Sequence, residues 1–160
     1  MDISVVLKNL IRDGIVSSTD PSTMTARVTF PDRDDLVSYP LEVLSHGSQD
    51  NKHYWVPGVG EQVLCLFLPQ NSNLSQGYIL GTTYNAKDKP SFNGQNIHGI
   101  KFADGSTISY DADGGGLVIN CTGNLTIEAP SGDVVVNGIS LVSHTHGGVV
   151  SGGGNTGTPN

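Results

Sequence analysis

Short strand-like runs separated by glycine-containing turns fill the C-terminal half of the chain, and they constrain its fold most. Between residues 98 and 142 they recur about every 8–10 residues, a spacing typical of β-helices. Six runs are present: Gly99–Phe102, Ser106–Tyr110, Gly116–Asn120, Asn124–Glu128, Asp133–Asn137 and Ile139–Val142. Within the runs, apolar residues alternate with Ser, Thr and Asn, as in Leu125/Ile127 and Val134/Val136. Each predicted strand therefore has one apolar face.

A single chain with this repeat has too few apolar residues to cover the apolar faces of its own strands. A single-chain β-helix of this length would also leave both of its ends exposed. Three chains wrapped around one axis would bring the three apolar faces together and pair neighbouring chains edge to edge. We therefore predict a homotrimeric, intertwined needle over residues 98–142, although the sequence alone leaves other oligomers open.

The N-terminal half has a different pattern, in which turn signals such as Pro57-Gly58 and Pro69-Gln70 separate short strand-like runs without a regular repeat. Strand-like runs occur at Ile15–Val16, Ala26–Phe30, Leu36–Tyr39, Leu41–Leu44, Val63–Leu68 and Tyr78–Leu80. Several short strands in so few residues predict a small closed barrel over residues 12–86. Residues 1–11 allow a short helix, capped by Asp2 or Ser4 and ending at Gly14, and the polar residues 87–97 predict a linker.

Charge and cysteine usage exclude several classes of function. The formal net charge is −7 with only 8 Lys and Arg residues, which argues against binding nucleic acid. The chain contains no run of 18 apolar residues that would predict a transmembrane helix, and no basic, apolar N-terminal signal is visible.

Cys65, inside an apolar run, is predicted to be a buried thiol. Neither Cys65 nor Cys121 has CxxC spacing, which agrees with synthesis in a reducing bacterial cytoplasm.

Two histidines follow the last predicted strand, in Ser143-His144-Thr145-His146. In an extended segment, residues i and i+2 point the same way, so His144 and His146 would project together. No Cys, Asp or Glu follows Asp133, and two imidazoles do not complete a metal site. Threefold symmetry would supply six imidazoles, which suit an octahedral transition metal such as iron better than zinc, calcium or magnesium. A pair of solvated histidines on a glycine-rich tail is the alternative.

Other residues carry weaker signals for chemistry. An HxH motif also occurs in cupin metal sites, but these need a later Glu and His, which this chain lacks. Asp111 and Asp113 suggest either a calcium loop or, more commonly, a plain turn. Trp55, the single tryptophan, is expected in the core or at the barrel mouth. With no P-loop, dinucleotide fingerprint or catalytic triad context, the chain is predicted not to be an enzyme.

The order of these features resembles a known family: the baseplate assembly protein V or central spike proteins of Mu-like contractile phages and R-type bacteriocins. Barrel motifs that carry the resemblance are Gly14-Ile15-Val16, Ala26 to Asp32, Tyr54-Trp55-Val56-Pro57, Val59 to Leu64 and Gly77 to Gly81. Needle and tip motifs are His98-Gly99-Ile100, Asp104-Gly105-Ser106, Ser143 to Val149 and Asn155 to Pro159.

The resemblance implies an all-β protein with an N-terminal OB-fold barrel, a triangular intertwined β-helix and a metal-binding apex over residues 143–160. At that apex one iron ion per trimer would be held by His144 and His146 from three chains. His46, His53 and His98 receive no such role. The implied function is a membrane-piercing spike, with tail hub or baseplate proteins as partners, the bacterial outer membrane as target, and a place in the virion or a tail-like particle.

A receptor- or glycan-binding tail-tip module is the competing function. An exposed aromatic cluster at the tip would favour it. No aromatic residue follows Tyr110, so the predicted point of the needle offers none.

Overall fold

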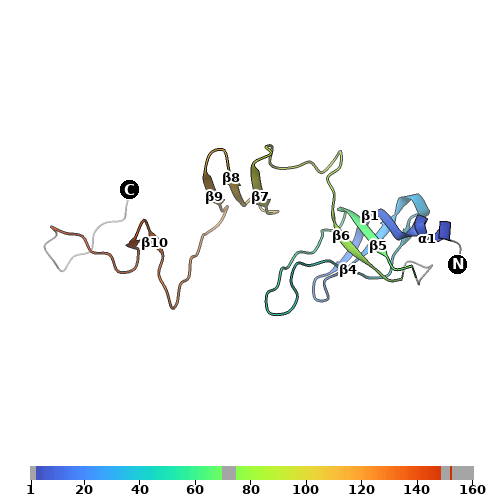
Figure 1. Cartoon of the computed structure of the whole chain (residues 1–160), viewed down its shortest axis with the longest axis horizontal. Coiled ribbons are helices and arrows are strands. Elements are labelled where there is room, and N and C mark those ends of the chain that lie inside the picture. Colours follow the sequence, from blue (N-terminus) through green and yellow to red (C-terminus); the bar gives the residue numbers. More distant parts are fainter. Residues whose placement is uncertain (1–2, 70–74, 149–151, 153–160) are drawn as a thin grey trace. The chain divides into compact units, whose positions relative to one another are not determined.

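The computed structural model describes residues 3–69, 75–148 and 152 of the 160-residue chain. It divides into two compact units, Met1–Asn93 and Gly94–Asn160; Figure 1 draws the whole chain and labels its helix and most of its strands. Much of the predicted apex, residues 149–151 and 153–160, lies outside the described residues, as does Asp2, one of the two candidate caps.

The first unit begins with helix α1 (Ile3–Leu10), and strand β1 (Ile11–Asp20) follows without a break. The expectation that the helix ends at Gly14 is therefore wrong. Gly14 lies inside β1, opposite Val63 of the neighbouring strand. A Cβ atom at this position would lie 2.9 Å from the carbonyl oxygen of Thr29 and still closer to the side chain of Val28. Glycine is needed here because two strands approach closely, rather than because a helix stops.

Five strands close into a barrel in this unit. After β1 come β2 (Thr25–Phe30), a 3-10 turn (Pro31–Arg33), β3 (Leu36–Val37), β4 (Leu41–Val43), β5 (Gln62–Phe67) and β6 (Gly77–Thr82). The strand order is β1-β5-β6-β4-β2, and β1 pairs with β2 to close the circle, while β3 extends β2 at one side. All pairs are antiparallel except β4 with β6. The predicted small closed barrel is confirmed, and five strands are the number expected of an OB fold.

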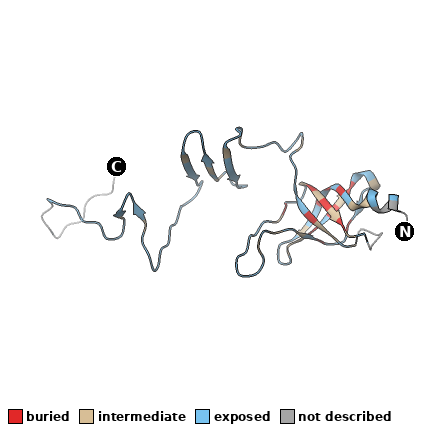
Figure 2. Cartoon of the chain, viewed as in Figure 1, coloured by how far each residue is buried: buried red, intermediate tan, exposed pale blue. Residues whose placement is uncertain are grey.

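The barrel interior holds the hydrophobic core. Alternate residues of β2 and β5 are buried, as a strand with one face toward a core requires. The core residues are Val16, Ala26, Val28, Phe30, Leu41, Val63, Cys65, Phe67 and Ile79, and Figure 2 shows the buried positions gathered in the barrel. Phe30 and Phe67 meet edge to face at 5.7 Å between ring centroids. Cys65 is fully buried, as the sequence predicts.

The second unit consists of two small antiparallel sheets. Strands β7 (Ile97–Lys101), β8 (Thr107–Asp111) and β9 (Gly116–Asn120) form one, and β10 (Val135–Val136) and β11 (Ile139–Ser140) form the other. The strand expected at Asn124–Glu128 is absent, because this segment has no neighbouring strand to pair with in the single chain. Its apolar residues Leu125 and Ile127 are 58% and 65% exposed.

No core forms in the described part of this second unit. Among residues 94–148 and 152, none is buried. Instead, the apolar side chains form exposed rows across the three-stranded sheet. Ile108 pairs with Ile100 on one side and Ile119 on the other, and all three are exposed. A neighbouring row places Tyr110 between His98 and Leu117. Within the described residues, no helix has the length and apolar character needed to cross a bilayer.

Candidate metal centre

A tight hairpin leads into the histidine pair. Strands β10 and β11 pair Val135 with Ser140 and Val136 with Ile139, which leaves Asn137 and Gly138 as a two-residue turn. Both turn residues have positive φ, +50° at Asn137 and +81° at Gly138. This is the conformation of a type I′ turn, for which Asn-Gly is the favoured sequence. The turn predicted at these two residues is confirmed.

Hydrogen bonds of Ser140 order the chain beyond the hairpin. The Ser143 amide donates to Ser140 Oγ over 2.7 Å, and the hydroxyl groups of the two serines lie 2.8 Å apart. The Leu141 amide donates to the carbonyl oxygen of Val134 over 2.9 Å, which continues the ladder by one step. These contacts form a compact turn that ends immediately before His144.

The rings of His144 and His146 lie together, as the i, i+2 spacing predicts. Their centroids are 5.0 Å apart with an interplanar angle of 78°, and both residues are exposed. His144 Nδ1 is 2.7 Å from the carbonyl oxygen of Ser140. A carbonyl oxygen only accepts hydrogen bonds, so Nδ1 carries a proton, and in the neutral imidazole Nε2 then keeps a free lone pair. Metal-bound histidines commonly have this arrangement, with one nitrogen on a carbonyl and the other on the metal.

The separation of the rings suits ligation of one ion. Two imidazoles on a metal at bond lengths of ~2.0–2.1 Å have centroids roughly 4.5–5.3 Å apart, for angles from right-angled to tetrahedral. The observed 5.0 Å lies within that interval. Across the described residues no cluster of three or more His, Cys, Asp or Glu side chains is found that could hold a metal. One chain therefore offers two imidazoles whose separation is compatible with a shared ion, and two ligands alone do not complete its coordination.

The other residues considered from the sequence lie elsewhere. His98 is in β7, opposite Tyr110. Asp111 and Asp113 form a plain turn, in which Asp111 Oδ1 accepts the Asp113 amide hydrogen over 3.0 Å. Trp55 is 49% exposed, so it lies at the barrel surface and not in the core. The contribution of Ser140 was missed, because a backbone carbonyl leaves no signal in a sequence.

Two comparisons with known proteins bear on this centre. A family model described as the GpV Apex motif matches residues 138–160, a segment that includes both histidines. The spike protein of Escherichia phage P2 is 29% identical over 120 residues, which cover 74% of this chain and 54% of that protein. The two matches support a relationship between this chain and the baseplate and central spike family. The chain spans about half the length of this spike-family relative, and the apex match begins at Gly138 of the type I′ turn.

Proposed function

We propose that the chain is the central spike of a contractile tail or a related injection machine, a homotrimer whose apex is held together by a metal ion. The observation that carries this proposal is the second unit, with apolar rows exposed across β7, β8 and β9 and no buried residue in its described part. A monomeric soluble protein rarely exposes a contiguous apolar face of this kind. We therefore expect another protein surface to cover it.

Copies of the same chain are the covering surface that we propose. Exposed apolar residues continue from the three-stranded sheet to the histidine pair: Leu117, Ile119, Leu125, Ile127, Val135, Val136, Ile139, Leu141 and Val142. Because these residues extend along the whole unit, a partner covering them must run along it as well. Three chains with parallel axes meet this requirement, and the unpaired segment at 124–128 would gain a neighbouring strand.

At the apex, His144 and His146 of each chain would hold the ion, with six imidazoles from three chains. Iron is the ion that we propose. When bound, it would cross-link three chain ends, and structural metal sites contribute about 10 kcal/mol or more of apparent binding free energy. The Ser140 carbonyl supports this role, since it holds His144 in the tautomer with Nε2 free. The described residues of the apex and the GpV Apex motif match together support the assignment.

The function of such a spike is mechanical. Chain ends are where a folded needle frays first, so an ion that joins three ends would keep the point intact under load. We propose that the spike crosses the bacterial outer membrane when the tail contracts, that hub or baseplate proteins hold the barrel, and that the chain has no catalytic activity. The similarity to the phage P2 spike protein supports a place in the virion or a tail-like particle.

The oligomer is tested with a charge placed on the apolar row. Ile108→Asp puts a carboxylate between Ile100 and Ile119, and it should convert a trimer, measured by light scattering coupled to size exclusion, into smaller species. Ser109→Asp adds the same charge to the neighbouring residue on the opposite face and should leave the trimer intact. A wild-type protein that is monomeric at micromolar concentration, or an Ile108→Asp variant that stays trimeric, contradicts the proposal.

The ion is tested separately by elemental analysis of the purified trimer. One iron per three chains is expected, and the double variant His144→Ala/His146→Ala should remain trimeric but lose the metal. His98→Ala is the matched control and should retain it. An iron-free trimer, or a double variant with unchanged iron content, would sink the apex assignment while leaving the oligomer untouched.

A further inference from the structure

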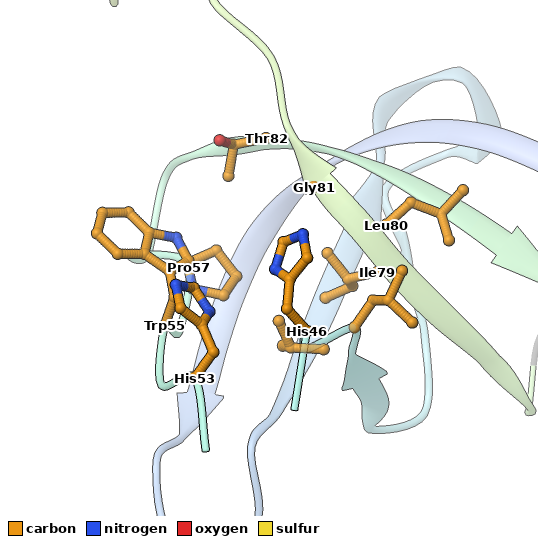
Figure 3. A pocket seen from close by; sticks show the side chains of 10 residues that line it. His46, His53, Trp55, Pro57, Ile79, Leu80, Gly81 and Thr82 are labelled. Atoms are coloured by element: carbon orange, nitrogen blue, oxygen red, sulfur yellow. The ribbon is translucent and has the colours of Figure 1, made fainter. Parts of the chain in front are cut away.

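A second histidine pair lies on the barrel, in the loop between β4 and β5. The rings of His46 and His53 are 5.3 Å apart between centroids, with an interplanar angle of 88°. Both line a hollow of about 180 Å³ beside β6, and Figure 3 shows them directed into it together with the indole of Trp55. This pair is independent of the apex histidines, which belong to the other unit.

The loop backbone brings these two histidines together. The His53 amide donates to the carbonyl oxygen of Gly47 over 3.0 Å, and Ser45 Oγ donates to the carbonyl oxygen of His53 over 2.6 Å. A β-bridge between Ser48 and Lys52 closes the loop further out. The residues next to both histidines are thus tied to each other by hydrogen bonds. The backbone that carries the two exposed histidines is held by the loop, so less backbone freedom is lost when a ligand binds.

The loop is also anchored to the barrel. The Leu44 amide donates to the carbonyl oxygen of Ile79 in β6 over 2.9 Å, directly before the loop begins. Ile79 and Pro57 are fully buried and form part of the wall of the hollow. The histidines therefore project from a loop that is held at its base, and the wall beside them is apolar.

The chemistry of the hollow selects one class of ligand. Its described lining contains two imidazoles and a threonine hydroxyl, Thr82, but no carboxylate. Imidazole nitrogens suit zinc, copper, nickel and iron, whereas calcium and magnesium need several oxygen ligands. The ring separation of 5.3 Å is at the tetrahedral end of the interval of roughly 4.5–5.3 Å for two imidazoles on one ion.

We propose that His46 and His53 bind one divalent transition-metal ion per chain, of the class represented by nickel and zinc. Two protein ligands leave further coordination positions to water. The site goes beyond the proposed spike function and does not depend on it, since every ligand comes from one barrel.

Trp55 makes the site directly observable. It is the single tryptophan of the chain and lines the same hollow. In the full chain with His144→Ala/His146→Ala, which removes the apex pair, nickel(II) should quench tryptophan fluorescence saturably with one equivalent per chain. Zinc(II), which has a filled d shell, should compete and restore the fluorescence.

Variants of the pair decide the assignment. His46→Gln and His53→Gln, placed in the same background, should each weaken nickel binding at least about tenfold, because even the loss of a ligand's outer partner costs about 10–100-fold. His98→Gln is the matched control and should leave binding unchanged. Two different single variants are used so that misfolding of one does not decide the result. An unchanged thermal unfolding transition shows that the barrel is still folded in each variant. Quenching that does not saturate below millimolar nickel, or that is equal in all variants, overturns the proposal.

Discussion

The hydroxyl group of Thr122 donates a hydrogen bond to Asp104 Oδ2 over 3.0 Å, although the two residues are 18 positions apart in the sequence. Ser106 completes the cluster, since its amide and hydroxyl also donate to the Asp104 carboxylate, each over 2.9 Å. Asp104 lies in the turn between β7 and β8, and Thr122 follows β9. The cluster therefore ties the turn between β7 and β8 to the end of β9.

These hydrogen bonds lower the pKa of Asp104, with the Ser106 amide as the largest cause, then the Ser106 hydroxyl and then Thr122. A carboxyl group whose pKa is lowered in the folded state stabilises that state above its ordinary pKa, here 3.8. The contribution is lost as the pH falls from there through the lowered value. We expect Thr122→Val to raise the pKa of Asp104 toward its ordinary value, as measured by carbon-13 NMR titration of the carboxyl group.

Thr126→Val is the control for this titration, because Thr126 is an exposed threonine that is not among the groups that shift the pKa of Asp104. The pKa of Asp104 should be the same in this variant as in the wild type. An equal pKa in the Thr122→Val variant would show that the Thr122 hydrogen bond does not form in solution.

Gly14→Ala should destabilise the barrel by about 1–3 kcal/mol, the usual cost of overpacking a well-packed interior. The added methyl group meets the side chains of Val28 and Phe30 and the backbone of Thr29. Urea denaturation followed by Trp55 fluorescence measures the change. Gly81→Ala is the matched strand control, since a Cβ atom there meets nothing within 4 Å. Equal unfolding midpoints for the two variants would contradict the close approach of β1 and β2.

The two cysteines should differ strongly in reactivity. Burial, and to a lesser degree the charge of Asp13, raises the pKa of Cys65 to about 12, and the thiolate is the reactive form. Cys121 is exposed. Brief iodoacetamide treatment at pH 8, followed by peptide mass mapping, should label Cys121 and leave Cys65 unmodified until denaturant is added. Early labelling of Cys65 would mean that the barrel opens readily.

Gly138→Ala should weaken the β10–β11 hairpin. At a φ of +81° a Cβ atom costs about 1–2 kcal/mol, which is large for a hairpin of four paired residues. NMR cross-peaks between Val136 and Ile139 should weaken in the variant. Gly132→Ala provides the comparison, because Gly132 has open space and no positive φ. Cross-peaks that persist unchanged in Gly138→Ala would show that the turn is not of type I′.

The barrel could be predicted from sequence because its strands carry their own pattern. In β2, the buried residues Ala26, Val28 and Phe30 alternate with the polar residues Thr25, Arg27 and Thr29, and this pattern indicates both the strand and its buried face. The helix end predicted at Gly14 was wrong, because a glycine can either end a helix or permit a close contact between strands. Only the packing against Val28 distinguishes the two.

The second unit could be predicted only in part, for a different reason. The turns at Asn137-Gly138 and at Asp111–Asp113 depend on local chemistry, and both form. The strand expected around Leu125 and Ile127 depends on a neighbour that a single chain does not provide. In the candidate centre, spacing indicated that His144 and His146 meet, whereas the carbonyl of Ser140 became evident only from the structure.

The unequal distribution of burial between the units has a kinetic consequence. The barrel collects all of its core from one chain, so its formation is a first-order process whose rate does not depend on protein concentration. If the apolar rows around Ile108 are covered by other copies, the second unit completes its fold only after chains collide, and that step slows on dilution. Newly made chains would then exist as finished barrels with unfinished C-terminal halves, and their lifetime in that state would be set by how many copies the cell makes at once.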